Sequence, residues 1–297
     1  MDTERERAVD KLVLRVKDLS TLPAVMEKIM ELTSDPDVSI AELEEAISTD
    51  PVISTKLLRI VNSAYYSFFR EITSIRHAIV VLGLQATKNL VYGTSIITAF
   101  GRETKIERFP LLSFWEFSVA CGNLSRTLSS LLDYPFYEEA FLAGLVHDIG
   151  KLIMANLRTK QFEEALIKAQ EDSIPLSQAE DEVVGFNHSD LGLRLAERWR
   201  LPQLLREAIA FNEQPRQAEG YPELTSVVRL ASQFCRLHSI GVSGEPDIPI
   251  ELRGEEAWQV LSESNGLLET LDFERFTLTL DEEIEKVRSF VHAIFSE

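Results

Sequence analysis

The chain has 297 residues, 45% of them hydrophobic, which suffices to bury a substantial core in one large or two smaller domains. Its formal net charge is −18, from 48 acidic and 30 basic side chains. This charge repels nucleic acids and anionic membrane surfaces unless basic residues cluster locally. The basic residues are scattered singly along the sequence, so we expect neither a nucleic-acid-binding nor a membrane-binding protein.

The first residues, MDTERERAVDK, are charged and lack the apolar core of a secretory signal. No apolar run approaches the roughly 18 residues that cross a bilayer, so we expect a cytoplasmic protein. Cys121 and Cys235 are too few for a disulfide framework or a zinc cluster by themselves. Their apolar helical surroundings indicate small core residues.

Helical periodicity prevails along the chain and no stretch predicts a hairpin, so the fold class is all-α. Ser39 and Glu42 have the spacing of a capping box at a helix start. Asp50 and Pro51 suit the N-cap and first position of the next helix. Gly83 follows an apolar run and suits a left-handed helix terminus.

Two further pairs with capping-box spacing predict helix starts in the second half of the chain. They are Ser177 with Glu180 and Thr279 with Glu282.

Breaks in the helical pattern predict the organisation of the chain. A charged segment closed by a proline, residues 101–110, separates two helical arrays, and a stretch rich in Gly, Pro and acidic residues, 240–254, predicts a loop before two short C-terminal helices. We therefore expect an N-terminal helical subdomain (1–105), a second helical subdomain (106–240), and C-terminal helices packed on the second (241–297).

The stretch GLVHDIGK, residues 144–151, carries the most distinctive chemistry. His147 and Asp148 are residue types that ligate metals, while Asp148 and Lys151 are spaced to pair on one helix. Gly144 and Gly150 indicate a close neighbouring helix, because glycine inside a helix costs about 1 kcal/mol and usually has a packing reason. A metal site, a structural pair and a pocket for an anion or nucleotide remain alternatives at this stage.

The residues from Leu22 through SDPDVSIAELEEAISTDPVISTKLLRIVNSAYYSFFREITSIRHAIVVLG resemble the N-terminal half of the HDOD domain, a bacterial signalling module related to the HD superfamily of metal phosphohydrolases. The similarity continues through FWEFSVA, FLAGLVHDIGKL, VVGFNHSDLGLRLAERWRLP and VVRLASQF, and so covers roughly residues 12–237. The resemblance implies an all-helical module whose second subdomain, 106–240, is HD-like.

Active members of the HD superfamily bind metal through a first histidine, the HD doublet, a distal aspartate and, in one branch, additional histidines. The resemblance places the doublet at His147 and Asp148 and a following histidine at His188. The remaining ligand positions carry side chains that bind divalent metals poorly: Phe117, Phe211, Asn212 and Ser232. The resemblance thus implies a vestigial HD site of His147, Asp148, Lys151 and His188, with no metal, no cofactor and no catalytic residue.

The first hypothesis is a non-catalytic regulatory protein in bacterial signal transduction that acts through protein–protein contacts. Its expected partners are signalling proteins of the kinase, receiver or diguanylate cyclase type, bound in trans. The alternative is a divergent HD-type metal-dependent phosphohydrolase acting on a nucleotide or cyclic dinucleotide, with Glu116, Asp190 or Asn212 in place of lost ligands. The sequence leaves the oligomeric state open.

Overall fold

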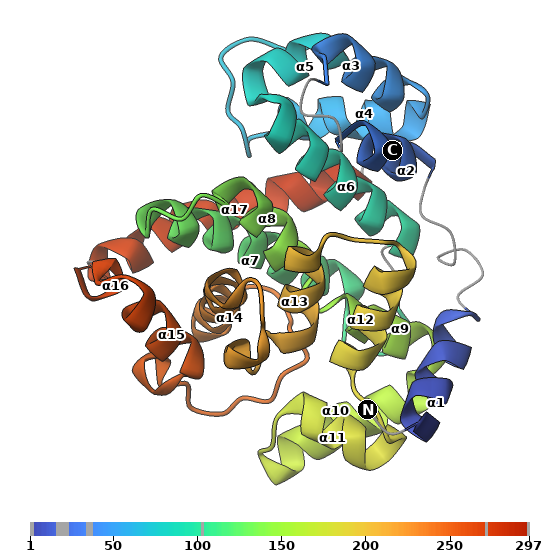
Figure 1. The fold of residues 1–297 in the computed structure, drawn as a ribbon, viewed down its shortest axis with the longest axis vertical. Helices are drawn as coiled ribbons and strands as arrows, with labels where there is room; N and C mark the ends of the chain where they lie inside the picture. Colours follow the sequence, from blue (N-terminus) through green and yellow to red (C-terminus); the bar gives the residue numbers. More distant parts are fainter. Residues whose placement is uncertain (1–2, 16–23, 34–37, 102–103, 271–272, 296–297) are drawn as a thin grey trace. The chain divides into compact units, whose positions relative to one another are not determined.

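The computed structural model describes residues 3–15, 24–33, 38–101, 104–270 and 273–295, with the backbone alone for 273–283 (Figure 1). Every regular element in these ranges is a helix, which confirms the predicted all-α fold.

Contacts between helices divide the chain into two units. The large unit consists of Met1–Ser20 and Glu103–Asp272, and the small unit of Thr21–Arg102 and Phe273–Glu297. The large unit contains α1 (Thr3–Val13), α7 (Leu111–Leu131), α8 (Tyr137–Val146), α9 (Ile149–Leu157), α10 (Thr159–Asp172), α11 (Leu176–Val184), α12 (His188–Arg198), α13 (Gln203–Phe211), α14 (Pro222–Leu237), α15 (Glu256–Ser264), α16 (Leu267–Thr270) and the 3-10 turns η1 (Pro215–Gln217) and η2 (Leu252–Gly254). The small unit contains α2 (Ala24–Thr33), α3 (Ile40–Ser48), α4 (Pro51–Val61), α5 (Ile75–Leu82), α6 (Leu84–Phe100) and α17 (Phe273–Phe295).

This division differs from the predicted subdomains at both ends of the chain. The chain passes between the units at Arg102–Glu103, close to the expected boundary at residue 105. However, α1 joins the large unit because it packs on α12, and α17 joins the small unit because it packs on α4 and α6. Within the small unit the rings of Tyr65 and Phe290 meet at 5.0 Å between centroids.

Two of the predicted helix starts have the expected chemistry. At α3 the backbone N–H of Glu42 donates to Ser39 Oγ at 3.2 Å, and the N–H of Ser39 donates to Glu42 Oε2 at 2.8 Å, so the capping box is confirmed. At α4 the Asp50 side chain accepts from two backbone N–H groups and Pro51 is the first helical residue. Gly83 ends α5 with a φ of 86°, but its ψ of 163° takes it out of the left-handed helical region.

Two other capping-box predictions are wrong, although a helix does begin beside Ser177. Helix α11 begins at Leu176, and Ser177 Oγ donates to Glu213 instead of capping its own helix. Helix α17 runs without interruption from Phe273, so no helix starts at Thr279, whose side chain lies outside the described residues. Where the sequence predicts two short C-terminal helices after the loop, the structure has two short helices, α15 and α16, and then one long helix, α17.

The core of the large unit is built on the contact of α7 with α8 and α14. Cys121 of α7 and Cys235 of α14 are fully buried there, which confirms that they are core residues. A Cβ atom added to Gly144 of α8 would lie 2.6 Å from the carbonyl oxygen of Cys121, so the predicted close helix neighbour at Gly144 is confirmed.

Among the described residues, one stretch, Tyr137–Leu157, is long and apolar enough to cross a membrane, with a mean hydropathy of 1.3. It comprises α8 and α9, and 89% of its apolar window is buried inside the structure. The expectation that no apolar run approaches membrane-spanning length is therefore wrong, although the burial identifies this stretch as a core segment.

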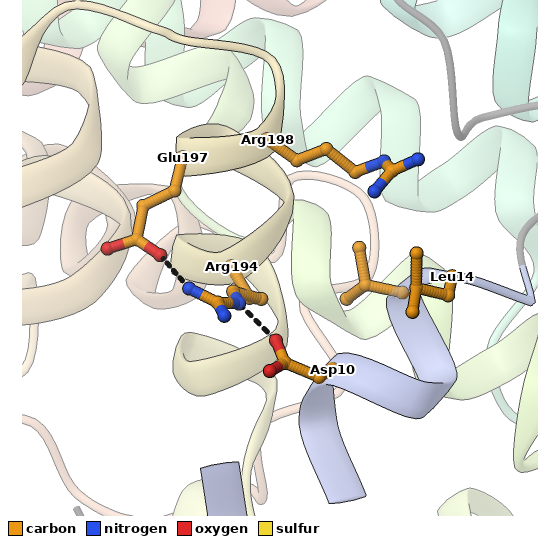
Figure 2. Close-up of a pocket in the computed structure, with 6 residues that line it drawn as sticks. Asp10, Leu14, Arg194, Glu197 and Arg198 are labelled. Carbon is orange, nitrogen blue, oxygen red and sulfur yellow. Dashed lines mark hydrogen bonds and ion pairs between the residues drawn. The ribbon is translucent and has the colours of Figure 1, made fainter. Parts of the chain in front are cut away.

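Ion pairs and apolar burial together fix α1 on α12 (Figure 2). Arg194 of α12 binds Asp10 of α1 and, at 2.8 Å, Glu197 of its own helix. Arg5 of α1 binds Asp190 at 2.5 Å. The apolar side of α1 is buried through the side chains of Val9, Leu12 and Val13.

Candidate functional site

The HD doublet lies at the break between two core helices. His147 is the C-cap of α8 and Asp148 the N-cap of α9, and both side chains are almost completely buried. His188, the first residue of α12, reaches the doublet because α12 packs closely on α9. A Cβ atom on Gly150 would lie 1.8 Å from the carbonyl oxygen of His188, so only glycine permits this approach and the prediction for Gly150 is confirmed.

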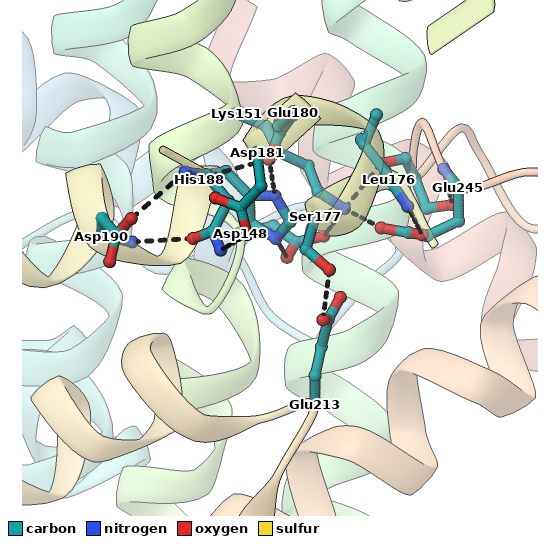
Figure 3. A network of polar contacts seen from close by, with 12 residues as sticks. Asp148, Lys151, Leu176, Ser177, Glu180, Asp181, His188, Asp190, Glu213 and Glu245 are labelled. Atoms are coloured by element: carbon teal, nitrogen blue, oxygen red, sulfur yellow. Dashed lines mark hydrogen bonds and ion pairs between the residues drawn. The ribbon is translucent and has the colours of Figure 1, made fainter. Parts of the chain in front are cut away.

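Lys151 is the central cation of the site (Figure 3). Its Nζ donates to Asp148 Oδ2 at 2.7 Å, to Glu245 Oε1 at 2.8 Å and to the carbonyl oxygen of Ser243 at 3.1 Å. Three acceptors match the three donors of an ammonium group. Burial opposes the charge of Lys151, but the two carboxylates outweigh it and raise the pKa of Lys151, so the ammonium stays charged.

Asp148 is the common partner of the other groups. Besides Lys151, it has His147 Nε2 at 3.4 Å from Oδ2 and His188 Nε2 at 3.7 Å from Oδ1. Burial opposes its ionisation, but the charges of Lys151 and His188 and the hydrogen bond from Lys151 hold the pKa of Asp148 well below its usual range. The structure thus brings together all four residues of the predicted vestigial site, His147, Asp148, Lys151 and His188.

His147 is held as a neutral imidazole. Its Nδ1 lies 2.7 Å from the carbonyl oxygen of Gly144, so Nδ1 carries the proton and donates it. Its Nε2 is buried and makes no hydrogen bond within the described structure. Burial lowers the pKa of His147. The ring of Phe117 lies 6.0 Å from the His147 ring, centroid to centroid, and fills the apolar side of the site.

His188 forms a buried charge pair with Glu180 of α11. Its Nδ1 lies 2.6 Å from Glu180 Oε2, and its backbone N–H donates to the same oxygen at 2.8 Å. Burial opposes the charge of His188, but the carboxylate of Glu180 outweighs it and raises the pKa of His188 to about 9. The tertiary contact with His188 explains why Glu180 does not cap its own helix.

Stability should fall as the pH rises from 6.5 through about 9. The folded-state pKa of His188 exceeds its ordinary value of 6.5, so the His188–Glu180 pair stabilises the protein fully below pH 6.5 and loses this effect as His188 deprotonates. The rise in the pKa of His188 corresponds to about 3 kcal/mol of stabilisation by the pair. The free energy of unfolding in urea, measured at a series of pH values, tests this prediction. His188→Gln should abolish this alkaline decline and His77→Gln should retain it; an identical slope in both variants would contradict the assignment.

Two acidic residues of the site, Glu213 and Glu245, carried no signal in the sequence because they lie in loops. Glu245 binds Lys151 and also accepts from the backbone N–H of Leu176 at 3.1 Å. Burial opposes its ionisation, but Lys151 lowers the pKa of Glu245 to about 2. Ligand atoms of Glu213, Glu245 and His188 lie within 4.8 Å of one another, beside an open hollow of about 470 Å³.

The loop that carries Glu245 is fixed against α7. The N–H of Val242 donates to the carbonyl oxygen of Ser113 at 3.0 Å. Gly241 has a φ of 64°, and a Cβ atom there would lie 2.3 Å from the same carbonyl oxygen. The loop therefore requires glycine at this position to bring Ser243 and Glu245 to Lys151.

Side chains at the predicted lost-ligand positions are mostly buried. Phe117, Asn212 and Ser232 are buried and Phe211 is partly buried. The Nδ2 atom of Asn212 makes no hydrogen bond within the described structure. The carboxylate of Asp190, considered as a replacement ligand, binds Arg5. It also accepts a hydrogen bond from the backbone N–H of Asn187, the N-cap of α12.

Known proteins with similar sequences and structures support the resemblance. A crystal structure of an HDOD domain protein from Geobacter sulfurreducens has a TM-score of 0.80 and 25% identity, over 99% of both chains. A Shewanella amazonensis protein described as a "Putative phosphohydrolase" has a TM-score of 0.72 and 25% identity, over 95% of this chain and 97% of that chain. A Marinobacter aquaeolei protein described as a "Putative signal transduction protein" shares the fold, with a TM-score of 0.77 and 18% identity over 99% of this chain and 66% of that chain.

A protein of Treponema pallidum (strain Nichols) is 26% identical over 242 residues, which are 80% of this chain. The chain spans about half, 46%, of the length of that relative. The model of the HDOD domain family matches residues 19–215, which is more than half of the sequence. The chain therefore belongs to the HDOD domain family.

Proposed function

We propose that this HDOD protein is a non-catalytic regulator in bacterial signal transduction that acts through contacts with other proteins. The observation that carries the proposal is the buried ammonium of Lys151, bonded to Asp148 and Glu245. Signalling proteins of the kinase, receiver or diguanylate cyclase type, bound in trans, are the partners we propose.

The donor set of the site fits an internal cation better than a metal ion. A catalytic metal needs about three protein ligands and an open position. Here Asp148 Oδ2 already accepts from Lys151, and a divalent ion beside that ammonium would be repelled. Phe117 packs against His147 from α7, where it offers no ligand atom. These residues do not provide a metal site that would activate a water molecule. We therefore take the site to be a structural element of the large unit.

A divergent metal-dependent phosphohydrolase is the second candidate. The buried Nε2 of His147 has no hydrogen-bond partner in the described structure, and its Nδ1–H is fixed on Gly144, which is the arrangement of a metal-ligating histidine. The cluster of His188, Glu213 and Glu245 offers further nitrogen and oxygen atoms. The Shewanella amazonensis relative described as a "Putative phosphohydrolase" also favours this candidate. Its substrate would be a nucleotide or cyclic dinucleotide.

Metal analysis separates the two candidates. We expect protein purified without chelator to contain manganese, iron, zinc and nickel well below one equivalent per chain, because Lys151 occupies the carboxylates. His147→Ala should leave this content unchanged, as should the exposed control His77→Ala. Elemental analysis measures the content. One equivalent of metal that His147→Ala removes and His77→Ala retains, together with turnover of a phosphodiester, would establish the enzyme instead.

A further inference from the structure

The large unit carries a concave basic surface, which we call the α1 basic pocket. It is lined by Glu4, Arg7, Ala8, Lys11, Leu12, Arg15 and Arg158, and its volume is about 570 Å³. Four cationic residues thus face one acidic residue in a chain whose net charge is −18. The sequence expectation that basic residues are only scattered is corrected here. Arg7 and Lys11 are four residues apart on α1, so the helix places them on one side, and Arg15 follows in the turn after the helix.

In the part of the chain that the structure describes, these cations lack the ion-pair partners that other basic residues of the same unit have. Within the described ranges, no ion pair engages any of the four, whereas Arg5 on the same helix binds Asp181 and Asp190 at 2.8 and 2.5 Å. The Nε atom of Arg158 is buried and makes no hydrogen bond in the described structure. A buried donor without an acceptor is costly, so Arg158 is arranged for an acceptor that the described residues do not supply.

The position of Arg158 adds positive potential. It is both the C-cap of α9 and the N-cap of the 14-residue helix α10, which has no side-chain cap at this end. Its backbone N–H donates to the carbonyl oxygen of Met154, and its own carbonyl accepts from Phe162 N–H, both at 2.8 Å. The backbone of this corner is therefore fixed, and Arg158 stands at the positive end of α10.

We infer that the α1 basic pocket binds a small molecule that carries two or more phosphate groups. Four cations require more than one negative charge, and guanidinium groups match pairs of phosphate oxygens. The volume lies in the range of small-molecule pockets. A nucleic acid would extend beyond the pocket over a surface of net charge −18, which opposes a long polyanion.

Isothermal titration calorimetry of the full chain with inorganic tripolyphosphate at low ionic strength tests the inference. We expect one bound ligand per chain, with affinity that falls as salt is added. Arg158→Gln should weaken binding about tenfold or more, and Arg15→Gln and Lys11→Gln several-fold. Lys105→Gln, which removes an exposed charge outside the pocket, should leave the affinity unchanged.

Arg15→Gln keeps the test sound if Arg158→Gln does not fold, because Arg15 is exposed and follows the end of α1. Circular dichroism of each variant identifies a folding defect. The inference is overturned if tripolyphosphate does not bind, if Lys105→Gln weakens binding as much as the pocket variants, or if a polyglutamate peptide binds while tripolyphosphate does not. The pocket shares no lining residue with the HD doublet, so its test is independent of the metal analysis.

Discussion

Replacing Lys151 by methionine should lower the free energy of unfolding by about 3–5 kcal/mol, the range found when one member of a buried ion pair is removed. Methionine keeps most of the side-chain volume but leaves Asp148 and Glu245 as buried carboxylates without their cation. Urea denaturation followed by circular dichroism measures the change. The loss should shrink when Asp148→Asn is added, because the second change removes one uncompensated charge.

Lys168→Met is the matched control. Lys168 also binds two carboxylates, Asp172 at 2.6 Å and Glu182 at 3.0 Å, but on the solvent-exposed side of α10 and α11. Water solvates these carboxylates once the lysine is removed, so the loss of unfolding free energy should be far smaller. Equal losses in Lys151→Met and Lys168→Met would show that burial of the Lys151 network has no special energetic role.

Gly150→Ala should destabilise the protein by about 3 kcal/mol or more, at or beyond the upper end of typical overpacking changes. The new Cβ atom would lie 1.8 Å from the carbonyl oxygen of His188 and 2.9 Å from the backbone nitrogen of Gly192. Both are backbone atoms, so α9 and α12 must separate, and His188 would move away from Asp148. The unfolding free energy of the purified variant measures the loss.

Gly266→Ala is the control for Gly150→Ala, because a Cβ atom at Gly266 meets no atom within 4 Å. It should leave stability nearly unchanged. A Gly150→Ala protein as stable as Gly266→Ala would contradict the close contact of α9 with α12.

Local chemistry in the sequence predicted much of the fold and part of the site. The pairing of Asp148 with Lys151 followed from their spacing, since both lie at the start of α9. The close helix packing followed from Gly144 and Gly150, because glycine costs helix stability unless a neighbour needs the space. The family resemblance placed His188 in the same site, although it is 40 positions from Asp148.

Partners supplied by distant segments could not be predicted from local patterns. Glu245 reaches Lys151 across 94 positions, on a loop whose path depends on Gly241 and α7. Ser177 and Glu180 had the spacing of a capping box, but Glu213 and His188 bind them instead, so tertiary contacts outcompeted the local bond. The α1 basic pocket depends on Arg158, which lies far from α1 in the sequence.

The order of segments in the two units has a consequence for synthesis on the ribosome. The chain passes from the large unit to the small unit, back again, and once more to the small unit at its end. Helix α1 is synthesised before its partner α12, and helices α4 and α6 are synthesised before their partner α17. Neither unit is a contiguous fragment, so we expect the core of the small unit to be completed only after α17 has been synthesised. A nascent chain stalled before Phe273 would expose the unfilled core of the small unit to chaperones.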